Sequence, residues 1–207
     1  MSNYNLTFKL KQHTPIIHFQ HQQHGATLRA SELKPKLDKY LIENSFGGIL
    51  NFNAYKEFLI GDTKSIDKGL KKIDDSSNIQ DKENAKREFL KQQKLAFNYK
   101  IKMEGETTDK EIDLQEKNRD GIPKIKFNRI TQINEPVIKA FPMFFATMGE
   151  EWGKNKKKFC FNHNTLLTIV TVEDELIKKI KEIFSLFILV TNFGTRQNKG
   201  FGSYYID

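Results

Sequence analysis

The sequence has one cysteine, few arginines and no long apolar run. A lone Cys160 cannot form an internal disulfide or a cysteine zinc cage. The longest apolar stretch, residues 183–190, is interrupted by Ser185 and is far shorter than the roughly 18 apolar residues that a membrane-spanning helix needs. The first 25 residues also lack the apolar core of a secretion signal. We therefore expect a soluble cytoplasmic protein with no membrane partner.

The length and composition favour one globular unit. The chain has 207 residues, which suits a single domain spanning 1–207 with room for a large insertion, and 17 phenylalanines supply bulk for its core. Residues 61–94 are rich in charge and poor in large apolar side chains. They predict an exposed, charged insertion at about 55–95, helical near residues 82–93.

The basic side chains gather at the two ends of the chain. The 34 Lys and Arg outnumber the 26 Asp and Glu, giving a net charge of +8, and only five of these basic residues are Arg. Residues 1–40 hold six bases against two acids, and residues 153–199 hold nine against four. Residues 104–120 reverse this, with seven acids against three bases. This balance favours a polyanionic partner, and we expect the two chain ends to come together in space as one cationic surface for it.

The apolar periodicity predicts an α+β protein. Residues 5–12 alternate apolar and polar side chains as a half-buried strand does, while Leu33, Leu37 and Leu41 share one face of a helix that starts at Ser31 or Lys34. The acidic residues 104–120 are expected to form a loop. Further strands are expected within residues 95–103, 123–130, 137–148, 158–172 (two short ones) and 204–206, and the clearest helix lies within residues 171–192, with Thr171 as its N-cap.

Residues 194–203 read Gly-Thr-Arg-Gln-Asn-Lys-Gly-Phe-Gly-Ser, the sharpest local feature. Gly194, Gly200 and Gly202 permit left-handed backbone, Arg196 and Lys199 add positive charge, and exposed N–H groups of such a loop can bind an anion. The spacing does not match a phosphate-binding loop of the Walker type or a dinucleotide fingerprint. The loop therefore suits a phosphate chain, and the alternative is an ordinary helix C-cap followed by a flexible hairpin.

A histidine-rich segment precedes the first predicted helix. Histidines stand at positions 13, 18, 21 and 24, and the helix start carries Arg29, Lys34 and Lys36. A helix start with basic flanks attracts phosphate. The imidazoles could stack on bases, donate to phosphate, act as a general base or remain plain polar loop residues. Metal binding is disfavoured because this spacing in an extended segment points the rings to different sides, so we expect no metal and no cofactor.

At these two segments the sequence resembles the repeat-associated (RAMP) superfamily of CRISPR systems. Residues 28–34 read Leu-Arg-Ala-Ser-Glu-Leu-Lys at the first helix, and the glycine-rich residues 194–202 lie near the end, in the order and separation typical of that superfamily. The Thr14-Pro15 pair after the first strand is similar to that of the type III-B (Cmr) subunit near the 3′ end of the guide RNA.

The resemblance implies a ferredoxin-like, RNA-recognition-type fold, an antiparallel sheet with helices on one face. It also implies a non-catalytic RNA-binding subunit of a type III antiviral CRISPR ribonucleoprotein, with guide RNA and sister RAMP subunits as partners and target RNA as a further candidate. Possible base-stacking residues are His18, Phe19, His21 and Phe201. The residues expected to bind the RNA backbone are Arg29, Lys34, Lys36, Gly194, Arg196, Lys199, Gly200, Phe201 and Gly202.

Three alternatives stay open at the level of the sequence. The first is a metal-independent endoribonuclease that processes guide RNA, with His18, His21 or His24 as general base, as in some members of the same superfamily. The second, metal-dependent cleavage through Asp109, Asp113 or Asp120, ranks last, because clustered acids repel RNA. The third is a scaffold that binds no nucleic acid, and it predicts no salt-dependent RNA binding.

Overall fold

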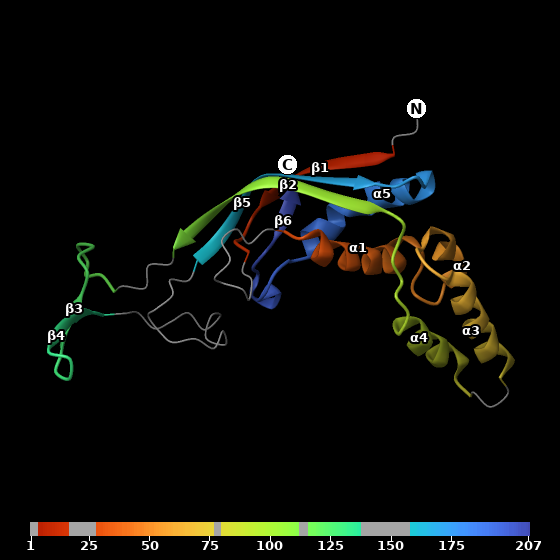
Figure 1. The fold of residues 1–207 in the computed structure, drawn as a ribbon, viewed down its shortest axis with the longest axis horizontal. Coiled ribbons are helices and arrows are strands. Elements are labelled where there is room, and N and C mark those ends of the chain that lie inside the picture. The colour runs from red at the N-terminus through yellow and green to blue at the C-terminus, as the bar shows by residue number, and fades with distance from the viewer. Residues whose placement is uncertain (1–3, 17–27, 77–79, 112–115, 138–157) are drawn as a thin grey trace.

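The computed structural model describes residues 4–16, 28–76, 80–111, 116–137 and 158–207. The chain begins with a strand, continues through a group of helices and a group of strands, and ends with a helix and a last strand (Figure 1). The elements are β1 (Asn5–Gln12), α1 (Ala30–Ser45), α2 (Phe52–Tyr55), η1 (Lys56–Phe58), α3 (Thr63–Asp75), α4 (Lys82–Lys91), β2 (Lys100–Glu111), β3 (Ile125–Asn128), β4 (Ile133–Pro136), β5 (Lys158–Val170), α5 (Asp174–Val190), η2 (Gln197–Lys199) and β6 (Tyr204–Ile206).

The main sheet is four-stranded and antiparallel, in the order β2-β5-β1-β6. The chain crosses from β1 through α1 and the helical insertion to β2, and from β5 through α5 to β6. The strands β3 and β4 form a separate two-stranded sheet between β2 and β5 in the sequence. The predicted α+β class with antiparallel pairing is therefore confirmed.

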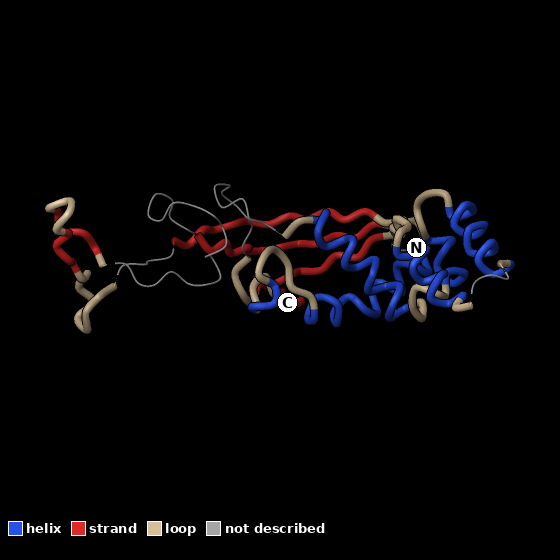
Figure 2. The backbone as a smooth tube through the Cα atoms, turned by 90° about the horizontal axis from the view of Figure 1, so that it is seen from below, coloured by secondary structure: helices blue, strands red, loops and turns tan. Residues whose placement is uncertain are grey.

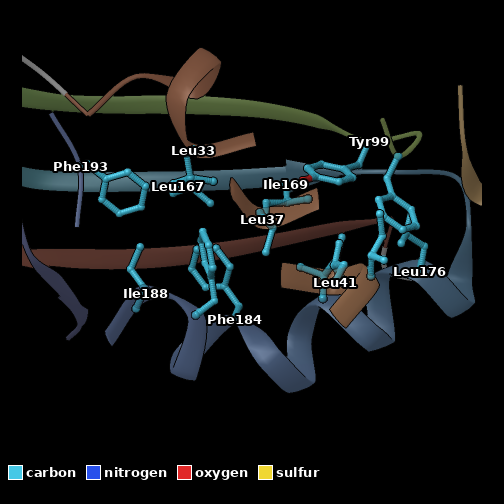
Figure 3. Close-up of a cluster of buried hydrophobic side chains, with 14 of the residues drawn as sticks. Leu33, Leu37, Leu41, Tyr99, Leu167, Ile169, Leu176, Phe184, Ile188 and Phe193 are labelled. Carbon is cyan, nitrogen blue, oxygen red and sulfur yellow. The ribbon is translucent and has the colours of Figure 1, made fainter. Parts of the chain in front are cut away.

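The helices α1 and α5 cover one face of this sheet (Figures 1 and 2). Phe8 of β1 stacks on Phe184 of α5 with ring centroids 4.1 Å apart. Between the helices and the sheet lies a continuous apolar core whose fully buried members include Leu33, Leu37, Leu41, Leu167, Ile169, Leu176, Phe184, Ile188 and Phe193 (Figure 3). Burial of these side chains is the main force that holds the helices to the sheet.

The alternation of residues 5–12 predicts β1 with its observed bounds. Leu6, Phe8 and Leu10 face the helices, and Leu10 is buried, while Thr7 and Lys9 are exposed on the open face. The 3.6-residue period also predicts the stripe of α5, where Ile177, Phe184 and Ile188 are buried. These expectations are confirmed because one local period decides them.

The expected loop at residues 104–120 is wrong for its first half. Residues 104–111 continue β2 and pair with β5 down to the Glu111–Lys158 pair, with a register shift at Gly105. Residues 95–99 precede the strand instead of forming it. An edge strand tolerates charged side chains and a bulge, and the partner strand supplies the hydrogen bonds that make the acidic segment extended.

The two short strands expected within residues 158–172 are one strand, β5. Asn164 adopts a left-handed φ of 50° opposite the irregularity in β2, so the ladder continues past it. The expected strand at residues 137–148 lies, apart from Val137, outside the described residues.

Two predicted helix starts also need correction. Glu173, not Thr171, is the N-cap of α5, and the Thr171 hydroxyl accepts the Glu173 N–H at 3.2 Å. The Arg29 carbonyl accepts the N–H groups of Glu32 and Leu33, both at 3.0 Å, so α1 begins at Ala30 and carries Pro35 inside the helix.

The expected insertion consists of α2, η1, α3 and α4 beyond the end of α1 (Figure 1). Its base adds Phe52, Tyr55 and Leu90 to the core, whereas α3 has no buried residue. The insertion therefore leaves most of its charged surface in solvent.

Candidate nucleic-acid interface

The glycine-rich loop between α5 and β6 has a strongly constrained backbone. Gly194, Gly200 and Gly202 have φ of 83°, 82° and 73°, and Arg196 shares the left-handed region at 60°. A Cβ added at Gly202 would lie 1.8 Å from the carbonyl oxygen of Phe193, so no other residue fits there without movement of the loop. The Phe193 N–H in turn donates to the Gly202 carbonyl at 2.9 Å, which closes the loop upon itself.

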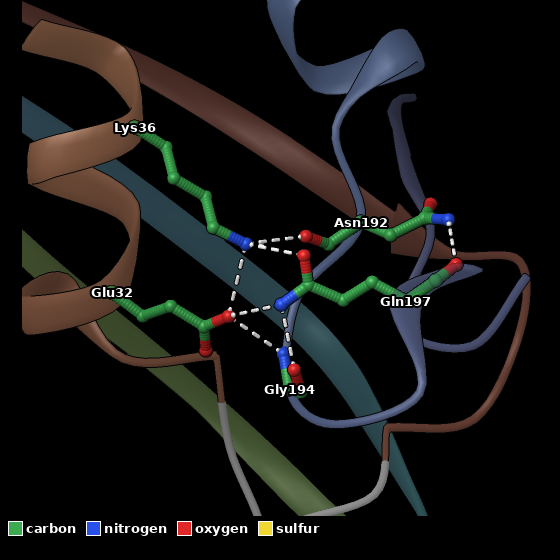
Figure 4. Close-up of polar contacts among 5 residues, drawn as sticks. All are labelled: Glu32, Lys36, Asn192, Gly194 and Gln197. Carbon is green, nitrogen blue, oxygen red and sulfur yellow. Dashed lines mark hydrogen bonds and ion pairs between the residues drawn. The ribbon is translucent and has the colours of Figure 1, made fainter. Parts of the chain in front are cut away.

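Glu32 in the first turn of α1 holds this loop against the helix (Figure 4). One oxygen of its carboxylate accepts the Gly194 N–H at 2.8 Å, the Gln197 side-chain N–H at 3.1 Å and the Lys36 ammonium at 3.1 Å. Lys36 also donates to the Asn192 carbonyl at 2.7 Å and to the Gln197 side-chain oxygen at 2.9 Å. Apart from the Glu32–Lys36 pair, these bonds join residues more than 150 positions apart in sequence.

Thr14 and Pro15 hold the loop from its other side. The Thr14 hydroxyl donates to the Gly200 carbonyl at 2.6 Å and accepts the Ser203 N–H at 3.0 Å. The Gly202 N–H donates to the Pro15 carbonyl at 3.0 Å. The two chain ends that the sequence marks as basic therefore meet in space, as expected.

Three basic side chains of this region, Arg29, Arg196 and Lys199, differ in their exposure to solvent. Arg29 at the N-cap of α1 and Lys199 in η2 are exposed. Arg196, three residues before Lys199, is half-buried. Gly200 and Asn198 are also exposed. The N–H groups of Gly194, Lys199, Gly200 and Gly202 all donate within the protein, so the expected anion nest of exposed N–H groups is not present at these positions. The surface of the loop therefore offers a phosphate strand its positive side chains.

Lys34 and Lys36, expected to bind phosphate, direct their ammonium groups into the protein. Lys34 lies 3.0 Å from the Asp38 carboxylate, donates to the Phe97 carbonyl at 2.8 Å and stands 4.0 Å from the centre of the Tyr99 ring. Lys36 belongs to the cluster around Glu32 described above. In the described structure the ammonium groups of both lysines therefore bind protein acceptors and stabilise the start of α1 and the adjoining loop.

Asp38 is the buried acid of this arrangement, with 4% of its surface exposed. Desolvation raises the pKa of its carboxyl, and the opposing influences are the Tyr99 hydroxyl, the Lys34 ammonium and the backbone at Phe97. The pair of Lys34 and Asp38 connects α1 to the segment that leads into β2.

Several predicted site residues lie outside the described residues, namely His18, Phe19, His21 and His24. Among the described histidines, His13 lies against the loop, where its backbone N–H donates to the Ser203 carbonyl at 2.9 Å. The described part of the chain contains no group of three potential metal ligands. Nor does any described helix have the length and apolarity to cross a membrane.

Sequence reasoning missed the roles of Glu32 and Gln197. The available signal for Glu32 is its i,i+4 spacing to Lys36 in a first helical turn, which indicates an ion pair on one helix face. No local signal reveals that the same carboxylate also accepts an N–H group from the far end of the chain.

Replacing Glu32 by alanine is expected to loosen the loop. The variant leaves the Gly194 N–H and Lys36 without their charged acceptor, which should lower the free energy of unfolding by about 2 kcal/mol. Hydrogen exchange of the Gly194 amide should accelerate, while that of the α5 amides should change only in proportion to global stability. Glu43→Ala on the same helix, away from the loop, is the matched control. Unchanged exchange at Gly194 would contradict the assigned role.

The family model described as the Cmr1 N-terminal domain matches residues 3–207, which is nearly the whole chain. No curated protein matches the chain significantly. The chain therefore belongs to the Cmr1 N-terminal domain family and is a subunit of the type III CRISPR Cmr complex.

Proposed function

We propose that this chain holds the backbone of single-stranded RNA, the guide RNA of its complex, along the edge formed by the glycine-rich loop and the start of α1. The observation that carries the proposal is the direct bonding of Glu32 to Gly194 and Gln197. Arg29 lies three residues before Glu32 in sequence, and the loop that Glu32 binds carries Arg196 and the exposed Lys199. Such a surface recognises phosphate and ribose independently of base sequence.

We further propose a ferredoxin-like fold of the RAMP type. The strand order β2-β5-β1-β6 supports this, because it interlocks two units of parallel strands, each connected through a helix on the same face. Membership of the Cmr complex supports guide RNA and sister subunits as the partners.

The open sheet face is a poorer candidate than the loop edge. RNA-recognition sheets stack bases on exposed aromatic rings. The exposed ring of Tyr205 on β6, opposite Lys11, lies on this face, but the three outward-facing rows that cross β2, β5 and β1 hold no aromatic side chain. They are Lys100, Val170 and Asn5; Lys102, Thr168 and Thr7; and Glu104, Leu166 and Lys9. No observation on the described residues favours the endoribonuclease, so binding is the function we propose.

The test removes the charges of the loop without disturbing its backbone. Arg196→Gly keeps a residue that accepts the left-handed φ, and Lys199→Ala removes an exposed ammonium. We expect the double variant to bind single-stranded RNA about tenfold more weakly, with a salt dependence shallower by about 1.4, or 0.7 per lost phosphate contact. Fluorescence anisotropy over a series of salt concentrations measures both quantities.

Lys178→Ala with Lys181→Ala is the control for this test. Both lysines are exposed on α5, so the control loses the same charge away from the loop. It should bind RNA nearly as the wild type does. If the loop variant matches the control in affinity and salt dependence, the loop is not the RNA-binding edge.

A further inference from the structure

The outer face of α3 carries a row of lysines. Lys64, Lys68 and Lys72 follow one another at intervals of four residues, Lys71 lies beside them, and all four are exposed. Four residues of helix rise by about 6 Å, so the three ammonium groups repeat along one line. This repeat is similar to the spacing of consecutive phosphates in an extended polynucleotide strand.

The fold does not compensate the charges of Lys64, Lys68 and Lys72. Like charges at i,i+4 oppose helix formation. The acids of α3 have other partners: Asp67 lies 3.6 Å from both Lys56 and Lys71, and Asp74 pairs with Lys86 on α4. Lys64, Lys68 and Lys72 form no ion pair with any described residue. The acid Asp75, the last residue of α3, follows Lys72 by three residues. The row therefore costs the isolated chain stability that an anionic ligand would restore.

The neighbouring helix α4 shows the ordinary pattern of a solvated face. Its exposed Arg87 follows Glu83 by four residues, and its Lys91 lies 2.7 Å from Glu88. The helix holds four bases and two acids, and two of its bases, Lys86 and Lys91, have ion-pair partners in Asp74 and Glu88. The two helices therefore differ in arrangement: three bases follow one another at four-residue intervals on α3, and nowhere on α4.

The position of α3 is fixed relative to the rest of the insertion. Gly69 leaves room for the Phe89 ring of α4, because a Cβ at Gly69 would lie 2.4 Å from that ring. Figure 1 places the insertion beyond the last turn of α1, whose first turn holds the glycine-rich loop. The 16 residues of α1 span about 24 Å and α3 lies beyond its end, so the row and the loop are separated by more than the length of this helix.

We propose that Lys64, Lys68, Lys71 and Lys72 of α3 form a second binding site for single-stranded RNA, which contacts the phosphates of the strand that the glycine-rich loop holds. This proposal rests on the proposed function. The row contains neither aromatic nor apolar side chains, so it binds without reading base identity. It extends the contact of one subunit with RNA over a distance of several nucleotides.

The experiment compares two triple variants with equal loss of charge. Lys64→Gln, Lys68→Gln and Lys72→Gln remove the row while keeping good helix formers. Arg87→Gln, Lys91→Gln and Lys94→Gln remove three exposed bases next to it, from α4 and the segment that follows. Each is titrated with a short RNA that spans only the loop and with an RNA long enough to reach α3. Circular dichroism checks that both variants keep their helices.

We expect the α3 variant to lose about tenfold in affinity for the long RNA, with a salt dependence shallower by about 2, and to bind the short RNA as the wild type does. Equal losses in the two triple variants would overturn the proposal, because only general electrostatics would then act. Unchanged binding of long RNA would also overturn it, and would leave the loop assignment intact if the loop variant still loses affinity. Loss of the α3 variant from the assembled Cmr complex with normal RNA binding would assign the row to a protein partner instead.

Discussion

Replacing Gly202 by alanine is expected to lower the free energy of unfolding by at least about 3 kcal/mol and to abolish RNA binding at the loop edge. The new methyl group would lie 1.8 Å from the Phe193 carbonyl oxygen, a backbone atom that cannot rotate away. The φ of 73° adds the strain of a left-handed residue, about 1–2 kcal/mol. Relief requires separation of residues 193 and 202, and that separation breaks the closure of the loop. Urea unfolding measures the loss.

Gly200→Ala is the matched control for this steric effect. Gly200 has a φ of 82°, but a Cβ there would meet no atom within 4 Å. Its replacement should therefore cost only the left-handed strain, about 1 kcal/mol, and leave RNA binding largely intact. Equal losses of stability in the two variants would show that the contact with Phe193 does not constrain the loop.

The sequence predicts those parts of the fold that depend on local chemistry. The alternation in β1 and the helical stripe of α5 each reflect a single period, and the three glycines mark a loop whose φ angles they make possible. The meeting of the chain ends was also predictable, because the basic segments suggest one shared polyanionic partner. Glu32 and Lys36 reveal only their own ion pair.

Nonlocal contacts account for the parts that sequence reasoning misses. The acidic residues 104–111 have weak strand propensity and become a strand because β5 offers a ladder of hydrogen bonds. Lys34 and Lys36 show the same limit at the site. A lysine at a helix start looks like a phosphate ligand, but the acceptors that engage both side chains include the Phe97 and Asn192 carbonyls, which lie more than 60 residues away. Residue type indicates the chemistry available, and tertiary contacts decide its use.

Replacing Lys34 by methionine is expected to destabilise the protein by about 3 kcal/mol at neutral pH. The substitution leaves the Asp38 carboxylate, whose side chain is 6% exposed, without its cation, and an uncompensated buried charge is costly. Asp38→Asn should cost less, because the Lys34 side chain is 25% exposed and can turn toward water. The double variant Lys34→Met with Asp38→Leu should be more stable than Lys34→Met alone, since it removes both charges. Urea unfolding of the three variants completes the cycle.

The pH dependence of this loss has a definite sign. Burial already raises the pKa of Asp38 from its ordinary 3.8, against the influence of Tyr99 and Lys34, and removal of Lys34 raises that pKa further. A group whose folded pKa is raised contributes stability below its unfolded pKa and loses it as the pH rises through the folded value. The difference in stability between Lys34→Met and the wild type should therefore shrink as the pH falls from neutral through the raised pKa of Asp38 in the variant. A difference that stays constant between neutral and acidic pH would mean that Asp38 is not the charged partner of Lys34.

The Lys34→Met variant also tests the site. At a temperature where the variant remains folded, its RNA affinity should show the wild-type salt dependence, because Lys34 binds the protein and not the phosphate.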